Sequence, residues 1–166
     1  MICAGIISDT HLYEVTDRFI EQCNLAFAQC SVIIHAGDLT EASILSVFEG
    51  KEIYGVHGNM CSSSVHKILP RTNSFQLEEV KLGLFHGAWG SRHNIEDRAW
   101  DLFPSADCII YGHTHQPVCH QVGKTTFINP GSFQGTGRYG SPGSYAIMEI
   151  NKDQIRAALH TLPQPS

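Results

Sequence analysis

The first half of the chain alternates short apolar runs with segments in which apolar residues recur at helical spacing. Residues 2–8, 32–35 and 52–56 are apolar runs of strand length, so each predicts a buried strand. Helical spacing in residues 17–29 and 40–48 predicts a helix between each pair of neighbouring strands. Strands that alternate with helices in this way form βαβ units, and they predict a largely parallel sheet.

Hairpins dominate the second half. Its strands are expected at residues 74–77, 82–86, 108–111, 118–122, 125–128, 144–150 and 155–161. A short helix is expected from Asn94 to the residue before Pro104. The change of pattern predicts a mixed or second sheet, so the expected fold class is α/β, with two sheets and helices outside them. Residues 1–162 are expected to form a single domain, followed by a flexible tail at residues 163–166.

Metal-ligand side chains and glycines follow five of the apolar runs. In chain order the clusters are Asp9-Thr10-His11, Gly37-Asp38, Gly58-Asn59, His86-Gly87 and Gly112-His113-Thr114-His115. Loops after the carboxyl ends of the strands build the site in open α/β sheets, so we expect the five loops to converge on one crevice. Residues two positions apart at a strand end point to the same side, so Asp9 and His11 can grip one ion, and the last cluster repeats that spacing.

The chemistry of these side chains indicates two metal ions. Mixed imidazole and carboxylate ligands suit Mn, Fe, Zn or Ni better than Ca or Mg. Seven candidate ligands are too many for one tetrahedral ion, but they fit two ions that share a ligand. Asp38 is the natural bridge, because a carboxylate has two oxygens. Two ions about 3.5–4 Å apart can hold a bridging hydroxide and bind phosphoryl oxygens, so the pattern predicts hydrolytic phosphate chemistry.

Composition and charge narrow the function classes. Ten histidines nearly equal the 11 lysines and arginines, which points to site chemistry, because imidazole is the commonest protein ligand for transition metals. The net charge of −5 without a basic run argues against binding to a nucleic-acid backbone. No apolar stretch approaches about 18 residues, and the N-terminal run lacks a basic flank, so neither a membrane span nor a signal peptide is expected. Six widely spaced cysteines favour reduced thiols and a cytoplasmic location.

The five clusters, taken in order, resemble the signature of the calcineurin-like metallophosphoesterases. The segment Asn129-Pro130-Gly131-Ser132 after the last cluster, in so short a chain, is similar to the small bacterial and archaeal phosphodiesterases of the YfcE type. This resemblance, which spans residues 9–132, implies a four-layer double β-sandwich flanked by helices, the metallo-dependent phosphatase-like fold. It also implies hydrolysis of phosphomonoesters or phosphodiesters by a metal-activated water, commonly with manganese and without a covalent intermediate.

The resemblance further implies a ligand set for each ion. The first ion would be held by Asp9, His11, His115 and the bridging Asp38. The second ion would be held by Asp38, Asn59, His86 and His113. Two divalent ions per chain are therefore expected, with manganese preferred and zinc, iron or nickel left open.

One position departs from the family pattern. The small phosphodiesterases usually carry Asp or His two positions after the Gly-Asn pair, placed to protonate the leaving group, and here that position is Cys61. A thiol is a poor replacement, because its unperturbed pKa is about 8.5 and its hydrogen bonds are weak. The task could fall instead to His57, to a metal-bound water or to no group. The candidate catalytic residues are therefore Asp38, Asn59, His57 and Cys61.

Asn59, Trp89 and Arg138 are candidates for contact with the substrate. Trp89, three residues after His86, could line the pocket and stack on a nucleobase, although tryptophan more often packs on the scaffold. Arg138 lies in a glycine-rich stretch and could bind phosphate bidentately, but a solvated loop arginine explains it equally well. His35 and His57 are both expected to have structural roles, orienting the loops that carry Asp38 and Asn59.

The predicted function is a dinuclear-metal phosphoesterase that hydrolyses small phosphodiesters by in-line attack of a metal-bridging hydroxide. The alternative is a non-catalytic protein-binding scaffold of the same fold, like the retromer subunit, in which the site is degraded. All seven ligand types are present here, which favours catalysis, and a mononuclear structural site leaves the surplus ligands unexplained. The expected partner is a small organic phosphate of open identity. The resemblance also allows a homodimer, although no apolar stripe identifies an interface.

Overall fold

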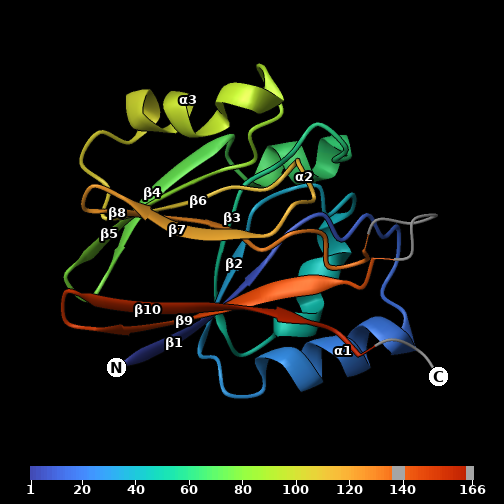
Figure 1. Ribbon diagram of the computed structural model, residues 1–166. Coiled ribbons are helices and arrows are strands. Elements are labelled where there is room, and N and C mark those ends of the chain that lie inside the picture. The colour runs from blue at the N-terminus through green and yellow to red at the C-terminus, as the bar shows by residue number, and fades with distance from the viewer. Residues whose placement is uncertain (136–140, 164–166) are drawn as a thin grey trace.

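Two five-stranded sheets form the centre of the molecule in the computed structural model, which describes residues 1–135 and 141–163 (Figure 1). The first sheet has the order β10-β9-β1-β2-β3, and its strands are β1 (Ile2–Ile7), β2 (Val32–His35), β3 (Glu52–Gly55), β9 (Ser144–Asn151) and β10 (Gln154–Thr161). The second has the order β4-β5-β6-β8-β7, and its strands are β4 (Thr72–Leu77), β5 (Val80–Phe85), β6 (Cys108–Ile110), β7 (Val118–Val122) and β8 (Thr125–Asn129).

Each sheet has a parallel centre. Strands β1, β2 and β3 run parallel, and β9 and β10 are added antiparallel at one edge. Strands β5, β6 and β8 are parallel, with β4 and β7 antiparallel on either side. The parallel strands of each sheet therefore end at a common edge, where the loops that follow them can meet.

Helices cover the outer faces of the two sheets. The helical segments are α1 (Asp17–Phe27), η1 (Ala42–Phe48), α2 (Ser63–Ile68), η2 (Arg92–Asn94) and α3 (Ile95–Leu102). Figure 1 shows α1 and α3 on opposite sides of the paired sheets. The expected double β-sandwich with flanking helices is confirmed.

Three apolar clusters hold these layers together. The central cluster lies between the sheets and includes Ile6 and Ile34 of the first sheet and Leu84 and Ile110 of the second, all fully buried. A second cluster lies between the first sheet and α1, η1 and α2, and a third lies between the second sheet and α3. Because each sheet is buried on both faces, its central strands are continuous apolar runs rather than alternating ones.

Most expected elements agree with the structure to within two residues, but one prediction was wrong and one helix was missed. The expected helix at residues 40–48 is the 3₁₀ segment η1, whose preceding residue Glu41 provides no side-chain cap. No helix was predicted where α2 lies, because this six-residue segment buries only Val65 and shows no apolar period. Helix α1 begins after Thr16, whose Oγ1 accepts a hydrogen bond from the Phe19 N–H over 3.1 Å.

Residues 164–166 of the expected tail and Arg138 lie outside the described residues. In the part of the chain that the structure describes, no helix is both long enough and apolar enough to cross a membrane.

Candidate metal centre

The predicted ligand loops meet at one edge of the molecule. Asp9 follows β1 and Asp38 follows β2, and the Asp9 N–H donates to the Gly37 carbonyl over 2.9 Å. On the second sheet His86 follows β5, and its carbonyl accepts from the Gly112 N–H over 3.1 Å. Neighbouring parallel strands therefore deliver their loops side by side, as the sequence pattern predicted.

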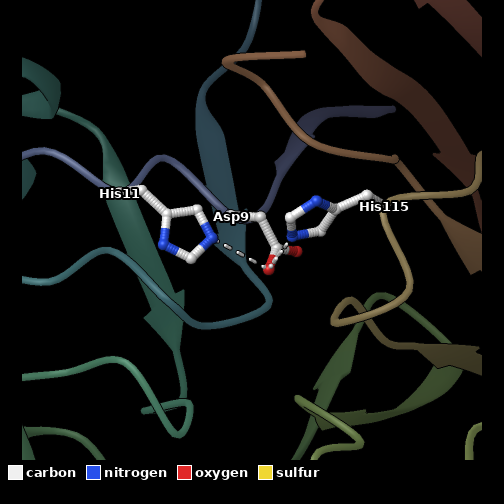
Figure 2. A group of neighbouring side chains, drawn as sticks. All are labelled: Asp9, His11 and His115. Atoms are coloured by element: carbon white, nitrogen blue, oxygen red, sulfur yellow. Dashed lines mark hydrogen bonds and ion pairs between the residues drawn. The ribbon is translucent and has the colours of Figure 1, made fainter. Parts of the chain in front are cut away.

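Asp9, His11 and His115 form the first of two triads whose ligand atoms lie within 4.8 Å of one another. In Figure 2 the two imidazole rings flank the Asp9 carboxylate and approach the same oxygen. The distance from Asp9 Oδ1 is 3.1 Å to Nε2 of His115 and 3.5 Å to Nε2 of His11. Three ligand atoms from two distant segments of the chain thus converge on one point.

Asp38, His86 and His113 form the second triad. Nε2 of His86 lies 3.1 Å from Asp38 Oδ2, and the ring centres of His86 and His113 are 5.2 Å apart. The two triads adjoin, because Nε2 of His11 is 3.9 Å from Asp38 Oδ2 and Nε2 of His86 is 3.9 Å from Asp9 Oδ1. Six of the seven predicted ligands are therefore gathered in one cluster.

The hydrogen-bond pattern of this cluster fits bound cations. Among the described residues, Nε2 of His11 and Nε2 of His86 are buried and have no hydrogen-bond partner. The other ring nitrogen of His86 donates to the Ala36 carbonyl over 2.7 Å, which leaves the lone pair on Nε2. Buried polar atoms without partners are costly, and a divalent ion that accepts these lone pairs removes the cost.

Each carboxylate has one oxygen held by the protein and one that faces the imidazoles. Oδ2 of Asp9 accepts from the Ser8 hydroxyl over 2.5 Å and from the His113 N–H over 3.1 Å. Oδ1 of Asp38 accepts from the Met60 N–H over 2.7 Å. The remaining oxygens, Oδ1 of Asp9 and Oδ2 of Asp38, are those that approach the ring nitrogens, so the donor set is oriented as a metal site requires.

Strained backbone is concentrated in the same residues. Five of the six clustered residues have φ in the left-handed region, with values of 55° at Asp9, 46° at His11, 55° at Asp38, 68° at His113 and 60° at His115. Such conformations cost about 1–3 kcal/mol each for residues with a Cβ, and they persist where the surroundings hold them. Their concentration at one cluster indicates that the loops are shaped for a function.

The charges of the cluster hold its carboxylates ionised. Burial alone would raise the pKa of Asp9, but contacts with His11 and His115 outweigh burial and hold this pKa well below its usual range. Burial would likewise raise the pKa of Asp38, but contact with His86 outweighs burial and lowers this pKa. Contact with Asp9 raises the pKa of His11, and Asp38 raises that of His86 against the effect of burial. Protons therefore compete with cations for the two histidines.

His35 supports the loops that carry the ligands. Its Nδ1 accepts from the Gly37 N–H over 3.1 Å, and its Nε2 lies 3.2 Å from the Thr10 hydroxyl. This fully buried ring connects the loop of Asp38 to the loop between Asp9 and His11. Burial lowers the pKa of His35 to about 4, so the ring is neutral at physiological pH. The expected orienting role of His35 is consistent with these contacts.

The segment from Asn129 to Ser132 supports the cluster from the other side. The Asn129 side-chain amide donates to the Gly112 carbonyl over 3.1 Å and to the Thr114 hydroxyl over 3.0 Å. The Ser132 hydroxyl donates to the Asp9 carbonyl over 3.0 Å. Ser132 thus connects this segment to the loop that carries Asp9.

The loop after β3 wraps the Asp38 carboxylate. A Cβ on Gly58 would lie 2.1 Å from Asp38 Oδ1, so a side chain there would displace the carboxylate. Asn59, the next residue, is exposed. The Cys61 thiol accepts a hydrogen bond from the Gly58 N–H over 3.3 Å, and it packs against the apolar cluster between the first sheet and α1.

His57 is half-buried, and burial followed by the charge of His66 lowers its pKa. Among the described residues, its Nδ1 is buried without a hydrogen-bond partner.

Trp89 lies in the loop after His86, and two side chains contact its ring. The Arg71 guanidinium carbon is 4.2 Å from the ring centre, and the His57 ring approaches edge-on at 5.4 Å. Sequence reasoning missed Arg71, and it also missed Arg98, which donates to the carbonyls of Gly87, Trp89 and Ser91 at 2.8–3.0 Å. No local motif marks such contacts, because the partners of Arg98 are 7–11 residues away, Trp89 is farther still from Arg71, and all of them meet only in the fold.

Comparison with known proteins identifies the family. The family model described as the calcineurin-like phosphoesterase superfamily domain matches residues 2–153, which is most of the chain. The chain belongs to the calcineurin-like phosphoesterase superfamily. A probable metallophosphoesterase of Methanothermobacter thermautotrophicus is 36% identical over 130 residues, covering 77% of this chain and 75% of that protein. The phosphodiesterase YfcE of Escherichia coli K12 is 34% identical over 104 residues, covering 59% of this chain and 53% of YfcE.

Solved structures confirm the fold of this phosphoesterase domain. Vps29 of Entamoeba histolytica, in a structure complexed with zinc, superposes with a TM-score of 0.78 over 99% of this chain and 95% of that chain. The two sequences are 23% identical, so this likeness concerns the fold alone. The chain is thus a member of this phosphoesterase superfamily, and six of its side chains that could bind metal lie together where the strands end.

Proposed function

We propose that this superfamily member is a dinuclear metal-dependent phosphodiesterase that acts on small organic phosphodiesters. The observation that carries the proposal is the pair of adjoining triads, in which Nε2 of His11 and Nε2 of His86 are buried and lack a hydrogen-bond partner within the described chain. The relative named YfcE phosphodiesterase supports diesters as the substrate class. Manganese is the proposed metal, with zinc, iron or nickel as substitutes, and the proposed location is the cytoplasm.

Each triad would hold one divalent ion. Asp38 is proposed as the shared ligand, because its Oδ2 lies 3.1 Å from Nε2 of His86 and 3.9 Å from Nε2 of His11. Asn59, which is exposed directly after the Gly58 turn, would be the fourth ligand of the second ion and would also contact the substrate. When bound, two such ions supply a nucleophile at neutral pH for in-line attack and neutralise charge on the phosphoryl oxygens. The residues of the chain fix the ligand orientations, and Ala36 and Ser8 hold His86 and Asp9 in place.

His57 is the better candidate for helping the leaving group depart. Its ring contacts Trp89 at the side of the cluster, and the charge of His86 contributes to lowering its pKa after burial and His66. Cys61 makes a hydrogen bond within its own turn instead. The lowered pKa of His57 makes it a poor proton donor at neutral pH, so aryl phosphodiesters, whose leaving groups need little protonation, are the better substrates.

Hydrolysis of bis-p-nitrophenyl phosphate by metal-stripped protein, before and after addition of Mn²⁺, tests the proposal. Activity should appear only with the metal, and Asp38→Asn should abolish it by weakening both sites. Folded protein that stays inactive with Mn²⁺, Zn²⁺, Fe²⁺ and Ni²⁺ would favour the alternative, a protein-binding scaffold, which the likeness to Vps29 keeps open. A homodimer is a further part of the proposal, and sedimentation would test it.

A further inference from the structure

A hollow of about 440 Å³ lies beside the loop that follows His86 and is not used by the chemistry proposed above. Its walls come from the start of β4, the end of β5, the loop after His86 and the last turn of α3. Six of its lining residues are Arg71, Phe85, Gly87, Trp89, Arg98 and Leu102. A hollow that combines apolar walls with few charged groups is the usual form of a small-molecule site.

The sheet register places this hollow beside the end of β5, the strand that leads to His86. Thr72 of β4 pairs with Phe85 of β5, so Arg71 lies beside the turn that carries His86. Gly87, the residue after that ligand, is part of the lining. Trp89 of the lining also contacts the His57 ring, which precedes the Gly58 turn around Asp38, so a phosphodiester bound at the cluster can extend one of its two substituents toward the hollow.

Arg71 is the positively charged side chain of the hollow that is available to bind a ligand. Its guanidinium stacks on the Trp89 ring at 4.2 Å, and this contact holds an otherwise exposed side chain at the edge of the hollow. Arg98 differs, because its guanidinium already donates to three backbone carbonyls of the 87–91 loop. Asp101 also lines the hollow, so two arginines and one aspartate leave the lining net positive.

We infer that this hollow is a subsite for the non-reacting part of a nucleotide-type phosphodiester. The apolar walls of Trp89, Phe85 and Leu102 take an aromatic base, and Arg71 binds a second phosphate group attached to the same substituent. This inference rests on the proposed function, because it assigns the second substituent of the proposed substrate.

Three chromogenic esters that share the p-nitrophenolate leaving group test it. They are methyl p-nitrophenyl phosphate, thymidine 5′-(p-nitrophenyl phosphate) and the 3′-phosphorylated form of the latter. Wild-type kcat/KM should rise about tenfold at each step of this series, the range expected for gain of one good contact. Trp89→Ala should remove the first step, and Arg71→Gln should remove only the second. Lys124→Gln, in the turn between β7 and β8, is the matched charge control and should retain both steps.

Equal losses on all three esters in Arg71→Gln, or none on any, would overturn the subsite while leaving the hydrolytic function intact. A binding measurement separates the two proposals further. The chain has two tryptophans, so Trp100→Phe leaves Trp89 as the only indole, and Phe keeps an aromatic ring against Phe127. Thymidine 3′,5′-bisphosphate should change the fluorescence of this metal-stripped variant saturably, and Arg71→Gln should weaken that binding about tenfold.

A saturable signal in a protein that hydrolyses none of the esters would support the subsite and contradict the proposed function. Turnover of all three esters at equal rates, without a saturable signal, would contradict the subsite and support the function.

Discussion

Nε2 of His86 lies 3.1 Å from Oδ2 of Asp38 at the point where the edges of the two sheets meet. The other ring nitrogen of His86 donates a hydrogen bond to the Ala36 carbonyl, and the Met60 N–H donates one to the other carboxylate oxygen of Asp38. In the neutral ring, Nε2 of His86 therefore directs a lone pair toward the anionic Oδ2 of Asp38. Such a pair is stable when a cation, or a proton on the ring, lies between them.

Loss of the His86 side chain should remove one metal ion. His86→Ala is expected to bind one Mn²⁺ per chain with high affinity instead of two, because the first triad of Asp9, His11 and His115 stays complete. Equilibrium dialysis followed by elemental analysis measures this number. His93→Ala, at an exposed position of η2, is the matched control and should bind two ions. Two ions in His86→Ala would show that this residue is not a ligand.

Proton uptake by His35 should weaken the fold at acid pH. Burial lowers the pKa of His35 from 6.5 to about 4, so between these values the unfolded chain binds a proton that the folded chain does not. The contribution of His35 to the free energy of unfolding should therefore fall as the pH drops from 6.5 to about 4, by at most about 3 kcal/mol. This contribution is complete above pH 6.5.

Urea unfolding of metal-stripped protein across this pH range measures the effect. In His35→Asn the amide oxygen can still accept from the Gly37 N–H, so this variant should fold with reduced stability at pH 7 and a shallower pH dependence. A pH dependence as steep as that of the wild type would contradict the role assigned to His35. His93→Asn should keep the wild-type slope.

Much of the fold and of the metal cluster could be predicted from the apolar runs and from the polar residues at their ends. Strands buried on both faces have to be continuous apolar runs, so β1, β2 and β6 are evident in the sequence. Parallel strands of one sheet end at a common edge, which places the loop of Asp9 beside that of Asp38 and the loop of His86 beside Gly112. The packing of the two sheets then brings Asp9 to His115, although they are 106 residues apart.

Features that arise from tertiary contacts could not be predicted in this way. Helix α2 buries a single residue and has no apolar period. The hydrogen bond from His86 to the Ala36 carbonyl joins residues 50 positions apart and involves a backbone atom, so no side-chain pattern encodes it. The left-handed φ of Asp9 and His115 also depends on the assembled loops, because Asp and His adopt that region more often than most residues with a Cβ but still only in a minority of cases.

Arg98 should control the order of the loop that follows His86. Arg98→Ala removes the three hydrogen bonds to the carbonyls of Gly87, Trp89 and Ser91, and it is expected to cost about 1–3 kcal/mol of stability. The KM for phosphodiesters should rise more than kcat falls, since the ligands of the two triads are unchanged. Urea unfolding and steady-state kinetics measure the two effects. Arg98→Lys, which keeps the charge but not the fork of donors, should show an intermediate loss, and wild-type values in Arg98→Ala would contradict this role.

Cys61→Asp should widen the range of substrates. A carboxyl group beside the Gly58 turn can protonate a poor leaving group, so hydrolysis of alkyl phosphodiesters should rise at least severalfold while that of aryl phosphodiesters changes little. The ratio of kcat/KM for a p-nitrophenyl diester and an alkyl diester measures this. Cys61→Ser, which offers no better acid, is the control. Equal rates on both esters in the wild type, with no change in Cys61→Asp, would show that leaving-group protonation does not limit the reaction.

The central claim is that two ions act together. Stepwise addition of Mn²⁺ to metal-stripped protein, with bound metal and hydrolysis of bis-p-nitrophenyl phosphate followed in the same samples, tests it most directly. Two ions per chain are predicted at saturation, with most of the activity appearing as the second ion binds. Full activity at one ion per chain, or two bound ions without any hydrolysis in folded protein, would contradict the account.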